Sequence, residues 1–304
     1  MRKLIVLAIA VPLFIWVANA GGQDRTRNST VTNNNDKPYS DDCLDHMRVG
    51  GDGYRTTVRD EEVKTVANQL LAITASRNGG VQVTTWDKPE FALKLCKQIA
   101  VDDENQGRKI LAETRLEING SKVTVITPAE DTYSLGTLLL VRAPKGASVS
   151  VSVHNGGVSF NGFSGTAEAS ADNGGISFKQ SSGKLTAKAQ NGGISITDCG
   201  GDVSATVQNG GLSLTLPDRW EGKGLDAHAH NGGLVVSVPK NFNGGLEITA
   251  SEHTSIICKD EICNDGQKTW DGGHKTFRLG GTNPQIRAST ENGGIVISER
   301  GHSR

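Results

Sequence analysis

The stretches NGGVSF (155–160), NGGISF (173–178), NGGISI (191–196) and NGGLSL (209–214) recur at a constant spacing, as their first positions show. In each stretch two apolar residues flank one serine, and successive side chains of a β-strand point to opposite faces. The apolar pair is therefore expected to point inward and the serine outward. A fixed period with this alternation predicts stacked copies of one small β unit. The triplet Asn-Gly-Gly occurs eight times in the chain, beginning at Asn78, Asn155, Asn173, Asn191, Asn209, Asn231, Asn243 and Asn292.

A second alternating pattern, built from smaller apolar residues, precedes the triplets. Leu185, Ala187 and Ala189, for example, are separated by polar residues. A layer of bulky side chains against a layer of alanines lets two sheets lie close together with few voids. We therefore expect an all-β fold, a β-solenoid or β-roll whose two-strand rungs of about 18 residues are stacked at about 4.8 Å. This repeat domain is expected over residues 146–298, with an excursion from the period at 250–285.

The Asn-Gly turns are expected to be structural. Asn and Gly both tolerate positive φ, which favours them in tight turns, and amide side chains at equivalent positions of stacked strands can form a hydrogen-bonded ladder. The pattern also assigns Leu246 and Ile248, which follow the triplet at Asn243, to the same column as Ile194 and Ile196. The asparagines assigned to structural turns are Asn155, Asn173, Asn191, Asn209, Asn231 and Asn292.

The start of the chain has the pattern of a secretory signal peptide. It begins Met-Arg-Lys, is apolar over residues 4–17 and then reads Ala18-Asn19-Ala20, so residues 1–20 are assigned to a cleaved signal. The apolar run is shorter than the roughly 20 residues that span a bilayer, and no transmembrane anchor is expected after signal cleavage. The protein is therefore expected to be exported and to be periplasmic, cell-surface associated or secreted.

Two further segments precede the repeats. Residues 21–42 are polar and are expected to form a disordered linker, and residues 43–145 are expected to form an irregular β module with one helix within 102–116. The formal net charge of −1 becomes −3 once Arg2 and Lys3 leave with the signal peptide. A chain this close to neutral lacks the basic surface that nucleic-acid binding requires, so no nucleic-acid partner is expected.

Five cysteines in an exported chain predict disulfide bonds. Cys258 and Cys263 are close enough in sequence to pair locally, and Cys43 and Cys96, both in the N-terminal module, form the next natural pair. Cys199 is left unpaired at a turn between rungs. The alternative is that all five cysteines are reduced.

The strand containing Asp226, His228 and His230 is the one candidate metal site. These side chains alternate on one outward face, and a His-x-His pair on a strand can hold a transition metal. The preceding rung offers only Thr206 and Gln208, which are poor third ligands. The column of His230 otherwise holds His154, Asp172, Gln190, Gln208 and Glu291. This variation is typical of a solvated polar surface, so no bound metal and no cofactor is expected.

No catalytic residue can be assigned from the sequence. It contains no nucleophile elbow, phosphate loop or His-Glu-x-x-His motif. Cys199 is a potential nucleophile, but no neighbouring base is evident. The regular columns hold turn-forming residues, core aliphatic residues and variable polar residues rather than a repeated acid-base pair.

The repeat Ala-x-Asn-Gly-Gly-Ile-Ser, the segment Val141-Arg142-Ala143-Pro144-Lys145-Gly146 and the closing Ser289-to-Ile295 stretch resemble the bacterial putative-adhesin family, over roughly residues 60–298. Residues 220–226 and the insert from Cys258 to Trp270 resemble an acidobacterial-type subgroup. The resemblance implies a β-strand-repeat domain on an exported envelope protein. It brings no established functional residues.

The leading hypothesis is an exported, non-enzymatic protein of adhesion or surface interaction, whose partner is a surface ligand, glycan or protein. Its binding surface is expected on an outward polar sheet face or on an end module. A first alternative is a polysaccharide-acting β-helix enzyme of the lyase type, which requires carboxylates and a Lys or Arg gathered on one face. A second alternative is an envelope signalling or stress component that binds a protein partner.

Overall fold

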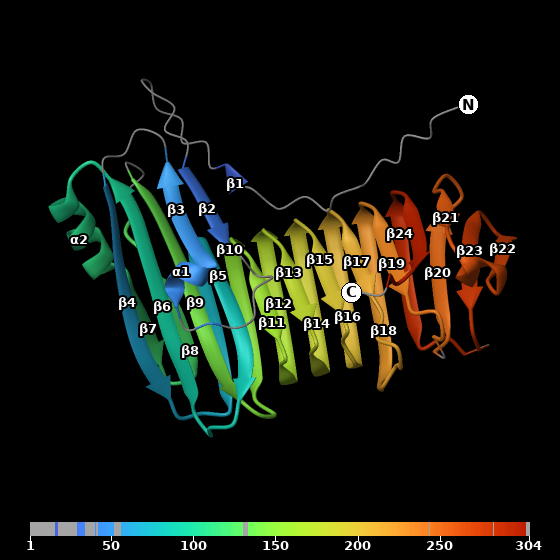
Figure 1. Ribbon diagram of the computed structural model, residues 1–304, viewed down its shortest axis with the longest axis horizontal. Helices are drawn as coiled ribbons and strands as arrows, with labels where there is room; N and C mark the ends of the chain where they lie inside the picture. The colour runs from blue at the N-terminus through green and yellow to red at the C-terminus, as the bar shows by residue number, and fades with distance from the viewer. Residues whose placement is uncertain are drawn as a thin grey trace.

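The computed structural model describes residues 16–17, 29–33, 40, 42–51, 56–129, 133–242, 244–281 and 283–301. Within them the chain is predominantly β, and most strands lie side by side along the long axis of the molecule (Figure 1). They join one large sheet that does not close on itself. The signal peptide assigned to 1–20 lies outside the described residues, apart from the two-residue strand β1 (Trp16–Val17).

Most strands belong to two ladders, and one rung comprises one strand from each. The alanine ladder contains β10 (Ser148–Asn155), β12 (Ser164–Asn173), β14 (Ser182–Asn191), β16 (Gly201–Asn209) and β18 (Gly222–Asn231). The serine ladder contains β11 (Val158–Asn161), β13 (Ile176–Lys179), β15 (Ile194–Thr197), β17 (Leu212–Thr215) and β19 (Leu234–Val238).

Pairing within both ladders is parallel and follows the sequence period. Asn173 lies opposite Asn191, and Ile176 lies opposite Ile194, each partner being 18 residues further along the chain. Strands on either side of a triplet therefore pair with neighbouring rungs rather than with each other. Parallel neighbours need a connection that runs back to the end at which the first strand began. The other strand of the rung forms part of that connection.

The core lies between the two ladders. Ile176, Ile194 and Leu212 of the serine ladder and Ala187 and Ala205 of the alanine ladder are all nearly inaccessible to solvent and belong to one cluster. Their outward neighbours Ser177, Ser195 and Ser213 are partly exposed. The inward and outward columns of these rungs therefore match the alternation in the sequence.

The triplets differ from the predicted turn geometry. Among the described non-glycine residues, positive φ occurs at Gln180, Asp198 and Asp260, so the triplet asparagines do not use it. Glycine is required at the second position because the rungs touch there. A Cβ on Gly174 would lie 1.8 Å from the carbonyl oxygen of Gly156, closer than any real non-bonded carbon and oxygen approach.

The triplet asparagines form the expected ladder of amide hydrogen bonds. From Asn173 onward, the Nδ2 of each donates to the Oδ1 of the asparagine on the preceding rung, at 3.0–3.1 Å. The series runs through Asn155, Asn173, Asn191, Asn209, Asn231 and Asn292. Its last step joins residues 61 positions apart, which shows that the spatial order of the rungs departs from the sequence order there.

At the C-terminal end the last strands of the chain lie between two rungs that precede them in the sequence. β24 (Ile286–Asn292) pairs with β18 on one side and with β20 (Leu246–Ser251) on the other. β25 (Ile295–Glu299) likewise lies between β19 and β21 (Ile256–Cys258). β20 and β21 thus precede β24 and β25 in the sequence but lie further from the central rungs.

This order corrects one column of the sequence analysis. Leu246 and Ile248 were expected in the column of Ile194, but they pair with Ile286 and Ala288 in the alanine ladder. The antiparallel strands β22 (Gln267–Asp271) and β23 (His274–Leu279) extend that ladder beyond β20. They lie in the segment that breaks the period, and Asn243 lies outside the described residues.

The N-terminal end repeats this interleaving. β5 (Leu70–Trp86) spans the triplet at Asn78 and pairs with both strands of the first regular rung, β10 and β11. On its other side lie β8 (Lys122–Ile126) and β9 (Ser134–Pro144). β6 (Phe91–Val101), β4 (Thr56–Val66) and β7 (Arg115–Asn119) then pair antiparallel at the edges. Part of the module expected at 43–145 therefore belongs to the ladders.

The expected helix within 102–116 is α2 (Glu104–Glu113), whose N-terminal amides are capped by Asp103. Lys97, only 6% exposed, holds its C-terminal end. Its Nζ donates to the carbonyl oxygens of Leu111 and Thr114 and lies 2.6 Å from Asp60. A buried ammonium is stable only when its donors are satisfied, and this one joins the helix to the outer strands.

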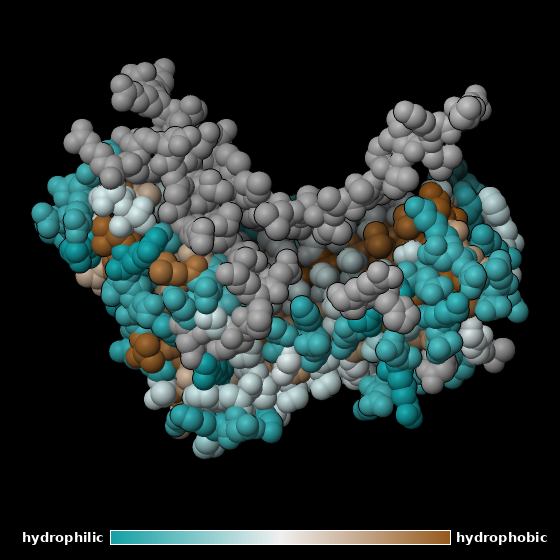
Figure 2. Space-filling model, in the orientation of Figure 1, coloured by the Kyte–Doolittle hydropathy of each residue, from teal (hydrophilic) through white to brown (hydrophobic). Residues whose placement is uncertain are grey.

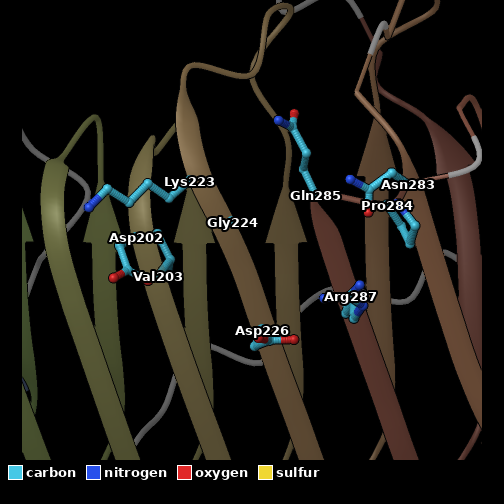
Figure 3. Close-up of a pocket in the computed structure, with 9 residues that line it drawn as sticks. All are labelled: Asp202, Val203, Lys223, Gly224, Asp226, Asn283, Pro284, Gln285 and Arg287. Carbon is cyan, nitrogen blue, oxygen red and sulfur yellow. The ribbon is translucent and has the colours of Figure 1, made fainter.

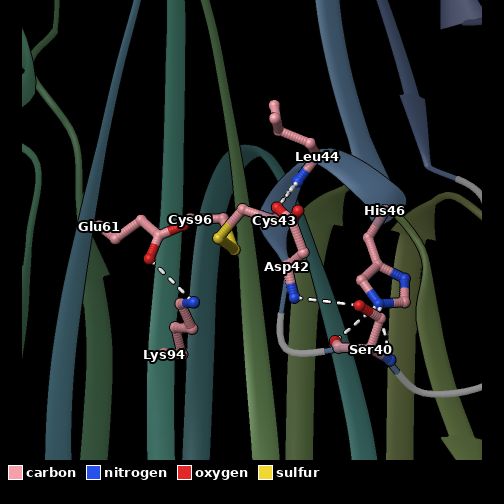
Figure 4. The surroundings of a disulfide bond; sticks show 8 residues. All are labelled: Ser40, Asp42, Cys43, Leu44, His46, Glu61, Lys94 and Cys96. Carbon is pink, nitrogen blue, oxygen red and sulfur yellow. Dashed lines mark hydrogen bonds and ion pairs between the residues drawn. A yellow bond between two sulfur atoms is a disulfide. The ribbon is translucent and has the colours of Figure 1, made fainter.

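Both expected disulfides are present. Cys43, in α1 (Cys43–His46), is bonded to Cys96 on β6 (Figure 4). Cys258 is bonded to Cys263 in the short 3-10 helix η1 (Glu261–Asn264). Cys199 is unpaired and buried. A small sheet of β1, β2 (Ser29–Asn33) and β3 (Met47–Gly51) completes the fold; its strand β2 differs from the disorder expected for residues 21–42.

Candidate functional site

The insertion of β24 beside β18 creates the most chemically varied surface of the alanine ladder. Asp226 lies opposite Arg287, and His228 lies opposite Ser289. His230 and Glu291 follow two residues further along their strands, on the same outward face. Three charged side chains and two imidazoles are thus gathered on two adjacent strands.

His228, His230 and Glu291 form a compact cluster. The Oε1 of Glu291 lies 3.3 Å from Nε2 of His228 and 3.1 Å from Nδ1 of His230. The two imidazole rings meet edge to face, with centroids 4.4 Å apart. The Nδ1 of His228 lies 2.7 Å from the hydroxyl of Ser289, so this second polar contact orients the ring.

The charge state of Glu291 reflects these neighbours. The hydrogen bond from His230 lowers the pKa of the Glu291 carboxyl, and the charges of both imidazoles act in the same direction against an opposing desolvation. The carboxylate is 54% exposed and each histidine side chain about one-third exposed. The cluster is therefore anionic at one point, rich in nitrogen donors and open to solvent.

The sequence identified part of this cluster. His228 and His230 are brought together as expected, but Asp226 is not one of the three groups whose ligand atoms converge. Glu291 takes its place. One signal was present in the sequence, because Glu291 belongs to the column of His230, but it did not show that the two residues lie on adjacent strands.

Asp226 instead lines a shallow pocket of about 330 Å³. Arg287 lies across from it, and Asp202 and Lys223 add one charge of each sign. Figure 3 shows Asp226 and Arg287 on neighbouring strands at one end of the pocket and Gln285 and Asn283 at the other. The lyase alternative requires carboxylates gathered with a Lys or Arg on one face, and β24 completes that combination here by bringing Arg287 beside Asp226.

The serine ladder carries a different surface on the three C-terminal rungs. These rungs are formed by β18 with β19, β24 with β25, and β20 with β21. The row that includes Ser177, Ser195 and Ser213 continues as Val235, Val296 and Ile257. Val235 is 43% exposed and Ile257 is 48% exposed. Figure 2 shows brown side chains in a line that runs toward this end of the molecule. Val296, between them, is partly exposed. Neighbouring aliphatic residues that reach the surface in this way mark interaction surfaces more often than isolated ones do.

Cys199 does not form an active nucleophile. Burial raises the pKa of its thiol to about 11, and the Sγ donates to the carbonyl oxygen of Thr197 at 3.3 Å. The carboxylate of neighbouring Asp198 is held by Arg300, which also contacts the carbonyl oxygen of Leu216. A neutral, enclosed thiol cannot attack a substrate, because the thiolate is the reactive form.

No protein-family model matches the chain, and no curated protein matches it. It is similar to the solved structure of a putative cell adhesion protein from Clostridium sporogenes, at 10% identity and a TM-score of 0.34 over 80% of this chain and 100% of that one.

Two further structures are similar to a comparable degree. A putative adhesin from Bacteroides fragilis has 10% identity and a TM-score of 0.29 over 81% of this chain and 97% of that one. A putative lipid binding protein from Parabacteroides distasonis has 8% identity and a TM-score of 0.33 over 81% of this chain and 98% of that one. The acidobacterial-type subgroup stays a prediction.

Membrane-spanning helices are absent from the described part of the chain. No helix there is both long enough and apolar enough to cross a bilayer.

Proposed function

We propose that the protein is an exported, non-enzymatic β-solenoid that binds a surface ligand of the cell envelope through its three C-terminal rungs. The observation that carries this proposal is the outward row of Val235, Val296 and Ile257, which continues the serine row of the central rungs. Replacing a solvated hydroxyl by an exposed aliphatic side chain is unfavourable in water unless a partner covers it.

The rigidity of the stack supports a binding role. Parallel pairing with one register, the amide ladder and the close glycine contacts fix each outward side chain relative to its neighbours. A preorganised surface loses little conformational entropy when a partner binds. Extended partners, either glycan chains or protein segments, match an elongated array of this kind.

Export is supported by the N-terminal pattern of the sequence together with two disulfides. Disulfide bonds persist in oxidising compartments and are rare in the cytosol. The solenoid interpretation is supported by the two parallel ladders, which advance one rung for each 18 residues in the central part of the chain.

The test is a comparison of ligand binding by the wild-type protein and by Val235→Ser/Val296→Ser/Ile257→Ser, which extends the serine row over the last rungs. Both proteins are applied to a glycan array and to intact envelope preparations. Lys188→Ser, on the outward face of the alanine ladder, is the matched control. At least tenfold weaker binding by the triple variant alone supports the proposal, whereas equal binding by all three proteins contradicts it.

The charged pocket favours a second candidate, a polysaccharide-acting enzyme. Asp202 and Asp226 are gathered there with Lys223 and Arg287, which is the combination that acid-base chemistry on an acidic sugar needs. Incubation with acidic polysaccharides, followed by detection of unsaturated products, tests this candidate. Turnover that Asp226→Asn abolishes would replace the binding proposal by an enzymatic function.

A further inference from the structure

We propose that His228, His230 and Glu291 form a binding site for a divalent transition-metal ion of the Zn²⁺ class. Their ligand atoms all lie within 4.8 Å of one another. Two imidazole nitrogens and one carboxylate oxygen are a donor set that such ions accept. The site is independent of the binding function proposed above, because it lies on the opposite ladder from the apolar row.

The observed separations match the coordination sphere of zinc. Bonds of roughly 2.0–2.1 Å in a tetrahedral arrangement place neighbouring ligand atoms roughly 3.4 Å apart. The two separations to the Glu291 oxygen, 3.3 Å and 3.1 Å, are already of this size. The third separation, between the two imidazole nitrogens, is at most 4.8 Å.

The ring of His228 is held as a metal ligand requires. Its Nδ1 is engaged by the hydroxyl of Ser289, and its Nε2 faces Glu291. Metal-binding histidines commonly use one nitrogen for the ion and the other for a polar group that fixes the ring. Ser289 is on β24 with Glu291, so the same strand supplies both a ligand and the group that orients another ligand.

The surroundings leave one coordination position open. Thr206 and Thr249 lie on the strands that flank β18 and β24, opposite His228 and Ser289 respectively. Neutral threonine hydroxyls are weak ligands, so three protein ligands and solvent complete the coordination. The partial exposure of all three side chains gives an ion direct access from water.

A second histidine–carboxylate pair provides a control within the same protein. His154 lies 2.8 Å from Asp172, one rung further along, and forms a pair of the same kind. No third metal-binding group is grouped with that pair among the described residues. If two groups were sufficient to bind metal, this pair would bind it as well.

The experiment uses purified protein freed of metal with a chelator and then dialysed. Zn²⁺ is titrated by calorimetry at pH 7.5, and Co²⁺ absorption in the visible range reports coordination by nitrogen and oxygen. The variants are His228→Ala, Glu291→Gln and Ser289→Ala, with His154→Ala as the control. Thermal melting without metal shows whether each variant is folded, which is expected because these side chains lie on the surface.

We expect one Zn²⁺ per chain for the wild-type and His154→Ala proteins. His228→Ala and Glu291→Gln should weaken binding at least tenfold, and Ser289→Ala should weaken it about tenfold, as loss of an orienting group does. Absence of Zn²⁺ binding by the wild-type protein overturns the proposal. So does equal binding by folded His228→Ala, or loss of binding by His154→Ala.

Discussion

The central rungs and the C-terminal rungs are both built by parallel strand pairing, but they differ in how far apart the paired strands lie in the sequence. From β12 to β17 each strand pairs with the strand one period later, and the connection between them is short. At the C-terminal end β24 and β25 pair with strands 61 residues earlier and also with the rung that precedes them in sequence. The regular part is a scaffold, whereas the interleaved part gathers side chains that the period keeps apart.

This difference has a physical consequence for the surface. In a periodic stack each outward residue is flanked by residues one period before and one period after it. Interleaving brings a strand with its own composition beside β18, and so places Arg287, Ser289 and Glu291 next to Asp226, His228 and His230. Both the pocket and the histidine cluster depend on β24, rather than β20, being the neighbour of β18.

Deleting parts of the two regions is expected to give the largest contrast. Removing residues 286–304 leaves a gap one strand wide between the β18–β19 rung and the β20–β21 rung, with unpaired edges on both sides. Backbone groups that lose their partners are costly, so we expect loss of a single cooperative melting transition, measured by circular dichroism. Removing residues 182–199 deletes one complete period and joins Ser181 to Gly200 in register, so cooperative melting should be retained. Cooperative melting of both deletions would contradict the proposed difference.

Alanine at the second glycine of a triplet should disturb both regions strongly. A Cβ on Gly174 would lie 1.8 Å from the Gly156 oxygen, and a Cβ on Gly293 would lie 2.1 Å from the Gly232 oxygen. We expect each substitution to lower the free energy of unfolding by roughly 3 kcal/mol, measured by chemical denaturation. Gly175→Ala is the control, because its Cβ would lie no closer than 3.6 Å to the nearest atom considered. A similar loss for Gly175→Ala would show that close contact between rungs is not the cause.

Interrupting the amide ladder should have a moderate effect. Asn191 accepts a hydrogen bond from Asn209 and donates one to Asn173, and both bonds are exposed. We expect Asn191→Ala to cost about 1 kcal/mol of stability, the usual net value of a hydrogen bond. Asn292→Ala, at the interleaved end, removes one such bond, to Asn231, and should cost less. Both losses are measured by chemical denaturation. A larger loss of stability for Asn292→Ala than for Asn191→Ala would contradict this prediction.

The smallest effect is expected at Cys199. Its Sγ donates to Thr197 as the hydroxyl of Ser181 donates to Lys179 one rung earlier, so Cys199→Ser should change stability by less than about 1 kcal/mol. Burial raises the pKa of the thiol from 9.0 to about 11. The neutral thiol is thus favoured in the folded chain, and its contribution to stability is present below pH 9 and is lost as the pH rises towards 11.

Two measurements check this prediction. Cys199→Ser should remove part of the decrease in stability between pH 9 and pH 11, and the wild-type thiol should react slowly with an alkylating reagent at pH 8 until the protein is unfolded. Rapid alkylation of the folded protein would contradict the enclosed environment of Cys199.

The sequence by itself determined the local rules of this protein. The constant period, the inward aliphatic and alanine columns, the asparagine ladder and both disulfide pairs follow from residue types and spacing. These features are local or strictly periodic, so the information needed to predict them lies within one or two repeats. The turn geometry was the exception, because the contact between Gly174 and Gly156 depends on how closely two rungs approach.

Only the tertiary structure decided which rung follows β18. A parallel ladder is held by backbone hydrogen bonds, which are nearly the same for every strand; a later strand with matching columns can therefore occupy the gap as well as the next strand in sequence. β20 and β24 both carry apolar residues at alternate positions, and in the structure β24 lies between β18 and β20. The position of Glu291 beside His228 and His230 is a consequence of that choice and is not encoded in the repeat.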